Sequence, residues 1–187
     1  CGQHDAPASV ARRHHGQKRR LIQTLSFEGL FLLVIFLLLA ALSLLWAFVE
    51  PNLLILRRED LPFEALPDEL CGFKIGLLTD LHCTSRHLNR VRRAAEKIAA
   101  HNPDVVLLCG DYADHPADAE RCLNAVRDVL HPPLGIFAVA GNHDRRYEGI
   151  EDILRHAGIT PLVNQTAVLH TSGRTLCLMG LDDFEEG

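Results

Sequence analysis

Three short blocks rich in carboxylate, imidazole and amide side chains recur along the chain, each directly after an apolar run. The blocks are Asp80-Leu81-His82, Gly110-Asp111-Tyr112-Ala113-Asp114 and Gly141-Asn142-His143-Asp144. Carboxylate and imidazole groups are common ligands of Mn, Fe and Zn in proteins. The residue types therefore point to a divalent-metal site, provided that the fold brings the three blocks together.

The segments around the blocks predict an α/β fold. Short aliphatic runs at residues 73–78, 104–109 and 134–140 are bounded by turn residues, which is typical of buried strands. Helix-like periodicity separates them, and successive strand–helix–strand units favour a largely parallel sheet. Strand-like runs at residues 160–163, 167–170 and 175–181 suggest antiparallel additions. Because ligands bind at the carboxyl ends of strands in open α/β sheets, the three blocks should meet at one edge.

Capping and turn residues bound the three expected helices. Ser85 is a candidate N-cap for the first helix, and Asn102-Pro103 should end it. Pro116 is expected at the first position of the second helix. Gly158 is a plausible C-terminal cap for the third helix, which should begin near residue 150.

The first two blocks offer ligands for one or two cations. On an extended segment residues i and i+2 point to the same side, so Asp80 and His82 could bind one ion. Asp111 follows Gly110 and has two oxygens, so it could bridge two metals. Such a pair clamps the attacking and leaving oxygens of an in-line displacement at phosphorus and lowers the pKa of a bridging water toward 7, which generates hydroxide.

The third block adds a ligand and a proton donor. The Asn142 amide oxygen is a fair ligand, while His143 could protonate a leaving alkoxide or stabilise phosphoryl charge. Asp144 could hydrogen-bond the His143 ring and fix its orientation. Each block alone could be a turn, a cap or a salt bridge. Their occurrence in order, each after an expected strand, favours a functional site.

The order D-x-H, G-D-x-x-D, G-N-H-D resembles the calcineurin-like metallophosphoesterases, above all their bacterial membrane-associated or exported branch. The resemblance covers roughly residues 73–183 and includes Thr79-Asp80-Leu81-His82 and Leu178-Met179-Gly180-Leu181-Asp182-Asp183. It implies a four-layer α/β/β/α sandwich holding two divalent ions, Mn, Fe or Zn. It also implies residue roles: Asp80 and His82 on the first metal, Asp111 as the bridge, Asn142 on the second metal, His143 near the leaving oxygen, and Asp114 in a mainly structural role.

The chain departs from the family pattern at its C-terminal side. The family completes its site with a G-H-x-H block, which this chain lacks, so the C-terminal part of the sandwich is expected to be missing. Two readings follow. The chain is the N-terminal part of a metal-dependent phosphohydrolase acting on phosphomonoesters or phosphodiesters, or it is a truncated, non-catalytic membrane protein retaining part of the fold.

A long apolar segment precedes this domain. Residues 29–49 contain no charged side chain, and about 20 apolar residues suffice to cross a bilayer, whereas signal peptides have shorter apolar regions. More Lys and Arg residues lie before the segment than just after it, which predicts a single-pass protein with a cytoplasmic N-terminus and an extracytoplasmic catalytic domain. The expected organisation is a basic tail at 1–28, whose first 20 residues should be disordered, a transmembrane helix at 29–49, a linker at 50–70 and the phosphoesterase domain at 71–187.

The net charge and the cysteine spacing limit the kinds of binding partner that we expect. The net charge of −5 gives no global bias toward nucleic acid, and basic residues beside a membrane segment are explained by orientation or anionic lipid. No C-x-x-C pair is present, so a thiolate metal site is not expected. Cys109 and Cys177 lie in apolar strand-like runs, where a free cysteine is expected to behave as a small hydrophobe. The expected partners are the membrane and a phosphoester substrate, for which a lipid-linked phosphoester or pyrophosphate is attractive because of the anchor.

Overall fold

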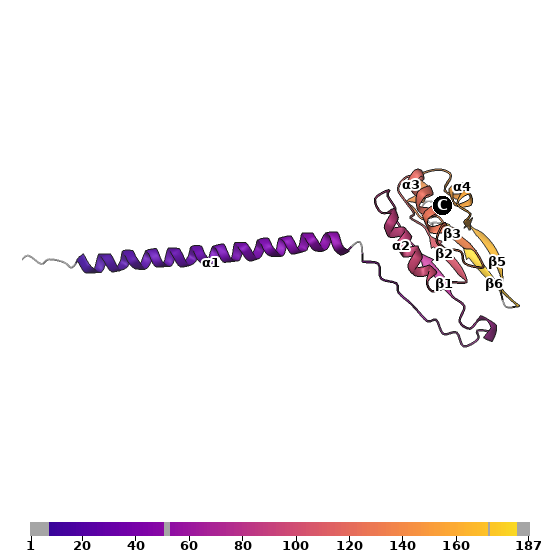
Figure 1. Cartoon of the computed structure of the whole chain (residues 1–187), viewed down its shortest axis with the longest axis horizontal. Helices are drawn as coiled ribbons and strands as arrows, with labels where there is room; N and C mark the ends of the chain where they lie inside the picture. The colour runs from indigo at the N-terminus through magenta and orange to yellow at the C-terminus, as the bar shows by residue number, and fades with distance from the viewer. Residues whose placement is uncertain (1–7, 51–52, 172, 183–187) are drawn as a thin grey trace, which may run out of the picture. The chain divides into compact units, whose positions relative to one another are not determined.

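A computed structural model describes residues 8–50, 53–171 and 173–182 of the 187-residue chain. The chain divides into two units, residues 1–53 and residues 54–187. The first unit contains one long helix, and the second contains every described strand together with three further α-helices (Figure 1).

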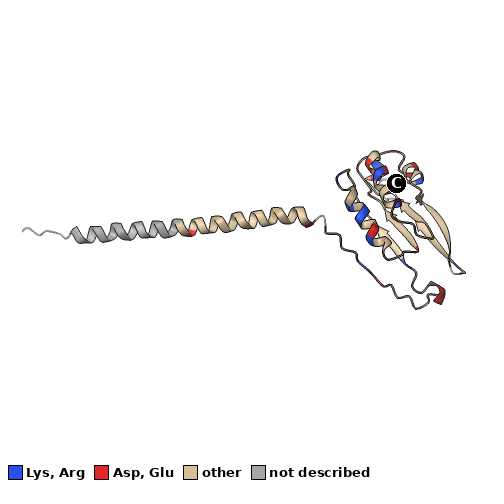
Figure 2. Ribbon diagram, viewed as in Figure 1, with Lys and Arg blue, Asp and Glu red and all other residues tan. Residues whose placement is uncertain are grey.

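Helix α1, Ala8–Val49, forms the first unit. Its stretch Phe27–Val49 is 23 residues long and apolar enough to cross a membrane, as expected from the sequence. Figure 2 shows this stretch almost free of charged residues. The expected disorder of residues 1–20 is wrong for residues 8–20, which are helical, while residues 1–7 lie outside the described part. Ala, Arg, Lys and Gln are strong helix formers, and extending an existing helix avoids the cost of nucleation.

The second unit is built on a four-stranded parallel sheet in the order β1-β2-β3-β4. Its strands are Ile75–Leu78, Val105–Cys109, Ile136–Val139 and Thr160–Pro161. Helices α2 (Leu88–Ala99), α3 (Pro116–Arg127) and α4 (Ile150–His156) connect them. Since Leu78 pairs with Leu108 and Leu108 with Ala138, the carboxyl ends of β1, β2 and β3 lie side by side.

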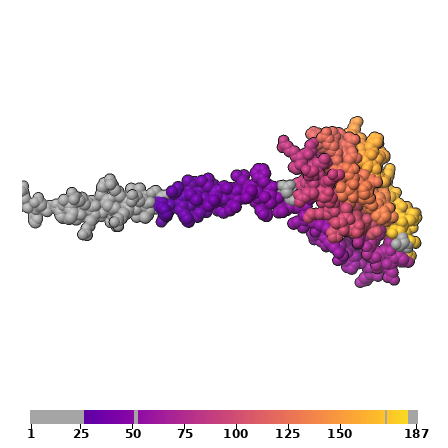
Figure 3. All heavy atoms as spheres, viewed as in Figure 1, coloured from indigo at the N-terminus to yellow at the C-terminus, as the bar shows by residue number. Residues whose placement is uncertain are grey.

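The sheet is covered on both faces. The side chains of Val106 and Leu108 belong to one core cluster with residues of all three connecting helices, including Leu123. A second cluster joins Val105 and Phe137 of the sheet to the antiparallel hairpin of β5 (Gln165–Thr171) and β6 (Arg174–Gly180). The hairpin, yellow in Figure 3, forms part of the outer surface. The described residues thus form three layers, α/β/β, which agrees with the α/β class and the antiparallel addition expected.

Two local predictions are confirmed, and the predicted cap at Ser85 is wrong. Pro116 is the first residue of α3, and Gly158, with φ +72°, follows the end of α4. Ser85 is not the cap of α2, because His87 precedes that helix and the Ser85 hydroxyl donates to Asp118 of α3 (3.0 Å). Cys109 and Cys177 are exposed rather than buried.

These two cysteines are exposed because of where they lie on their strands. Cys109 is the last residue of β2, and Cys177 is paired with Val168, whose side chain is also exposed. Both positions of that pair therefore lie on the outer face of the hairpin. An apolar strand pattern cannot separate the two faces when each carries apolar side chains.

Candidate metal centre

The segments that follow β1 and β2 run side by side beyond the ends of the strands. The His82 N–H donates to the Asp111 carbonyl oxygen (2.9 Å). The Asp80 N–H donates to the Gly110 carbonyl oxygen (3.2 Å), and the Cys83 N–H donates to the Tyr112 carbonyl oxygen (2.7 Å). This ladder fixes the first block against the second.

The segments after β2 and β3 are held together by two glycines. A Cβ on Gly110 would lie 2.5 Å from the Gly141 nitrogen, and a Cβ on Gly141 would lie 2.2 Å from Asp111 Oδ1. Gly110 also has φ +82°, a conformation that side chains disfavour. Only glycine at both positions lets the two loops approach closely enough to place the Asp111 carboxylate.

Gly110→Ala is therefore expected to lower the free energy of unfolding of the residue 54–187 unit by about 2 kcal/mol or more. Gly149→Ala is a matched control, because Gly149 has φ +84° but no heavy atom within 4 Å of the added Cβ. Pulse proteolysis in urea would measure both. Equal losses for the two variants would show that the close approach of the loops contributes nothing.

Asp144 is completely buried and binds the loops that carry the other blocks. Its carboxylate accepts hydrogen bonds from the backbone N–H groups of Asp111 (2.7 Å), Tyr112 (3.0 Å) and Gly141 (3.0 Å), and from the Tyr147 hydroxyl (3.2 Å). Burial raises the pKa of the Asp144 carboxyl above its usual value, while the N–H donors act in the opposite direction. Among the described contacts, the Asp144 oxygens accept from these donors and not from the His143 ring, so an effect of Asp144 on that ring stays a prediction.

Tyr112 adds a second buried bond between the strand ends. Its hydroxyl accepts from the Gly110 N–H, and its single proton can be shared between the carbonyl oxygens of Leu108 and Val139, which both lie within hydrogen-bond distance. Burial raises the pKa of Tyr112 well above its ordinary value. Sequence reasoning did not identify this residue, although an aromatic residue between the two acids of the second block was the available signal.

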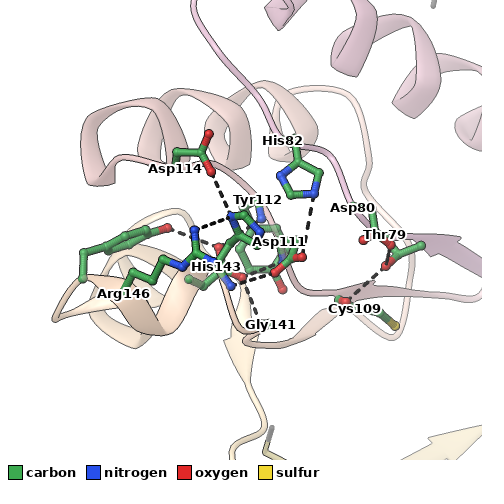
Figure 4. Close-up of polar contacts among 12 residues, drawn as sticks. Thr79, Asp80, His82, Cys109, Asp111, Tyr112, Asp114, Gly141, His143 and Arg146 are labelled. Atoms are coloured by element: carbon green, nitrogen blue, oxygen red, sulfur yellow. Dashed lines mark hydrogen bonds and ion pairs between the residues drawn. The ribbon is translucent and has the colours of Figure 1, made fainter. Parts of the chain in front are cut away.

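Three of the predicted site residues come together at the edge of the sheet (Figure 4). His82, Asp111 and His143 each offer a ligand atom, and these atoms all lie within 4.8 Å of one another. Asp111 Oδ2 lies 3.7 Å from His82 Nε2, while Asp111 Oδ1 accepts the His143 backbone N–H (3.0 Å). The two imidazole rings meet edge to face, with centroids 4.8 Å apart.

This donor set suits a divalent ion. Metal–nitrogen and metal–oxygen bonds of Zn²⁺ are about 2.0–2.2 Å long, so ligand atoms on one ion lie about 3–4 Å apart. The 3.7 Å between Asp111 Oδ2 and His82 Nε2 lies in that range, and all three ligand atoms lie within 4.8 Å of one another. The set combines two imidazoles with one carboxylate and no thiolate, a donor set that could bind a metal ion.

Asp80 and Asn142 are not part of this group. The Asp80 carboxylate is exposed and accepts a hydrogen bond from the Thr79 hydroxyl (2.6 Å), and Asn142 is exposed on the loop that carries His143. The expectation that Asp80 and His82 share a side assumed an extended segment. Asp80 (φ +52°) and His82 (φ +38°) instead have left-handed backbone conformations, so the alternation rule does not apply. Their roles as ligands stay predictions.

The His143 ring has partners on its outer side. Its Nδ1 lies 3.0 Å from Asp114 Oδ1 and 3.3 Å from an Arg146 guanidinium nitrogen. The hydrogen bond with His143 lowers the pKa of the Asp114 carboxyl. A proton on Nδ1 satisfies Asp114 and leaves Nε2 available toward the metal group. Asp114, expected in a mainly structural role, therefore occupies the place beside the His143 ring that was expected for Asp144.

Comparison with known proteins identifies similar sequences. The sequence model of the calcineurin-like phosphoesterase family matches residues 73–184, more than half of the chain. The chain is 32% identical over 133 residues to a zebrafish (Danio rerio) transmembrane protein with metallophosphoesterase domain, which covers 67% of this chain and 30% of that protein. It is 36% identical over 150 residues to the phosphodiesterase YaeI of Escherichia coli. This match covers 75% of this chain and 54% of YaeI.

A third similar protein carries a more specific name. The chain is 32% identical over 111 residues to the UDP-2,3-diacylglucosamine pyrophosphatase LpxG of Chlamydia trachomatis, which covers 57% of this chain and 34% of that protein. The chain thus spans between 30% and 54% of the length of these three proteins.

Proposed function

Because the chain belongs to the calcineurin-like phosphoesterase family, we propose that it is a membrane-anchored, metal-dependent phosphohydrolase that cleaves phosphomonoester or phosphodiester bonds. The observation that carries the proposal is the convergence of His82, Asp111 and His143 at the carboxyl ends of the parallel strands. Two divalent ions, which family members generally use, would polarise the phosphoryl group and make a water molecule a better nucleophile.

Each residue of the site has its own role in this proposal. His82 and Asp111 would hold the cations, and the exposed side chains of Asp80 and Asn142 would rotate to complete the ligand set. His143, although close to this group, would serve as the proton donor to the leaving oxygen rather than as a metal ligand, and Asp114, in contact with Nδ1, would keep the ring oriented. Asp144 and the close contact between Gly110 and Gly141 fix the positions of the loops that carry these groups.

The anchor suggests where the substrate is found. The apolar stretch of α1 and the similarity to transmembrane proteins of this family support a membrane location. The excess of Lys and Arg before the stretch favours a cytoplasmic N-terminus and an extracytoplasmic catalytic domain. A lipid-linked phosphoester or pyrophosphate is the favoured substrate class, since tethering raises encounters with substrates in the same membrane. LpxG, named as a pyrophosphatase of a diacylated sugar nucleotide, supports this choice.

Hydrolysis of bis-p-nitrophenyl phosphate and p-nitrophenyl phosphate by the protein expressed from its complete reading frame tests the proposal. We expect a chelator to abolish hydrolysis and Mn²⁺, Fe²⁺ or Zn²⁺ to restore it. The ester that is cleaved faster identifies the class handled. Absence of activity with every metal would contradict the proposal and favour the non-catalytic reading.

A further inference from the structure

Two adjacent arginines that follow the third block have different environments. The Arg145 side chain is 20% exposed and is held by carboxylates: Nε donates to Asp182 (3.0 Å), and a terminal nitrogen lies 3.7 Å from Glu151. These contacts join the turn that follows the third block to the segment after β6 and to α4. Arg146 is exposed, and in the described part of the chain its guanidinium meets only the His143 ring, at Nδ1 (3.3 Å).

This single contact does not compensate the positive charge of the Arg146 guanidinium. A guanidinium only donates hydrogen bonds, so it needs an unprotonated Nδ1. Asp114 lies closer to the same atom, at 3.0 Å, and needs a protonated Nδ1. Nδ1 cannot be protonated and unprotonated at once. The shorter contact, to the Asp114 carboxylate, favours the protonated Nδ1. Within the described residues, no carboxylate oxygen lies within 4.0 Å of the Arg146 guanidinium.

The position of Arg146 relates it to the metal group. Figure 4 draws Arg146 and Asp114 on one side of the His143 ring and His82 and Asp111 on the other. If His143 is the proton donor to the leaving oxygen, as proposed above, the leaving group would lie on the side of the metal group that carries His143 and Arg146. An arginine fork matches the geometry of two phosphate oxygens.

On these grounds, and resting on the proposed function, we propose that Arg146 binds the second phosphate of a diphosphate-bridged substrate. Water adds to the phosphorus held at the metal group, and the anhydride P–O bond breaks. The electron pair of that bond leaves with the second phosphate. Arg146 offsets the negative charge that develops there, and the proton released from water passes to solvent. No other reactant is required.

A matched pair of substrates tests this role in the full chain. Bis-p-nitrophenyl diphosphate differs from bis-p-nitrophenyl phosphate by one added phosphate group. We expect Arg146→Gln to reduce kcat/KM for the diphosphate by about 10- to 100-fold, the size of a hydrogen bond to a charged group, and by at least 10 times more than for the monophosphate diester. Arg146→Lys should recover part of the loss. Arg155→Gln, at an exposed arginine paired with Glu151 and Asp152, should change neither rate.

Equilibrium binding gives a readout that does not depend on turnover. Calorimetry with imidodiphosphate and with inorganic phosphate, in the presence of Mn²⁺, should show Arg146→Gln weakening imidodiphosphate about tenfold more than phosphate. Equal losses for both ligands, or for both substrates, would overturn the proposal for Arg146. If the wild type hydrolyses neither ester, the proposed function fails, and the binding comparison still decides whether Arg146 recognises a second phosphate.

Discussion

Replacing Asp111 with asparagine is expected to lower kcat/KM for phosphoester hydrolysis by about 10³-fold or more, equivalent to about 4 kcal/mol of transition-state stabilisation. Asparagine has nearly the same volume and keeps an oxygen that can accept the His143 backbone N–H, as Asp111 Oδ1 does at 3.0 Å. It lacks the negative charge that a bridging ligand supplies to two cations. The substitution should therefore weaken metal binding while preserving this hydrogen bond.

Two measurements accompany the kinetics. The metal content of the purified variant, determined by mass spectrometry, should fall, whereas the unfolding midpoint of the metal-free protein should change little. Asp128→Asn is the matched control, because Asp128 is an exposed aspartate paired with Arg92 at 3.5 Å and lies at the end of α3. An Asp111→Asn enzyme with near wild-type activity, or one that loses activity at full metal occupancy, would contradict the bridging role.

The fold was predictable because its pattern is local and strongly periodic. Buried strands at residues 105–109 and 136–139 are continuous apolar runs, and the amphipathic helices between them have clear boundaries, such as Pro116 and Gly158. Strand–helix–strand order then favours a parallel sheet whose carboxyl ends meet. The same reasoning correctly brought His82, Asp111 and His143 to one edge.

The details of the site were not predictable from local rules. Asp80, His82 and Asp111 all have positive φ values, which are uncommon for residues other than glycine and occur where surrounding contacts impose them. Those contacts join segments about 30 residues apart, as in the hydrogen bond from His82 to the Asp111 carbonyl. Rules that assume an extended backbone, and so place residues i and i+2 together, fail at such positions.

The roles of the acidic residues illustrate the same limit. Adjacency in sequence favoured Asp144 as the partner of His143, whereas the structure gives that place to Asp114, 29 residues away. Residue type alone cannot separate the two carboxylates, since either can accept from an imidazole. What separates them is burial: Asp144 is 0% exposed and faces backbone donors, and Asp114 is exposed beside the ring.

Asp144→Asn is expected to lower the free energy of unfolding of the residue 54–187 unit by about 3 kcal/mol or more. The carboxylate accepts three backbone N–H groups and one hydroxyl, and an amide offers only one oxygen while turning its NH₂ toward donors. Each buried donor left without an acceptor costs about 1–3 kcal/mol. Pulse proteolysis in urea would measure the loss, and Asp152→Asn, on the exposed side of α4, should stay within about 0.5 kcal/mol of the wild type.

This result also separates a structural from a catalytic role for Asp144. If its function is to hold the loops, the loss of stability should be accompanied by weaker metal binding, because Asp111 receives one of the broken hydrogen bonds. If Asp144 instead acted on His143, the variant would fold with wild-type stability and metal affinity and lose only kcat. That outcome would contradict the structural role assigned to Asp144. Loss of stability together with weaker metal binding would mean that Asp144 contributes to the site by fixing the backbone of the loops that carry the metal ligands.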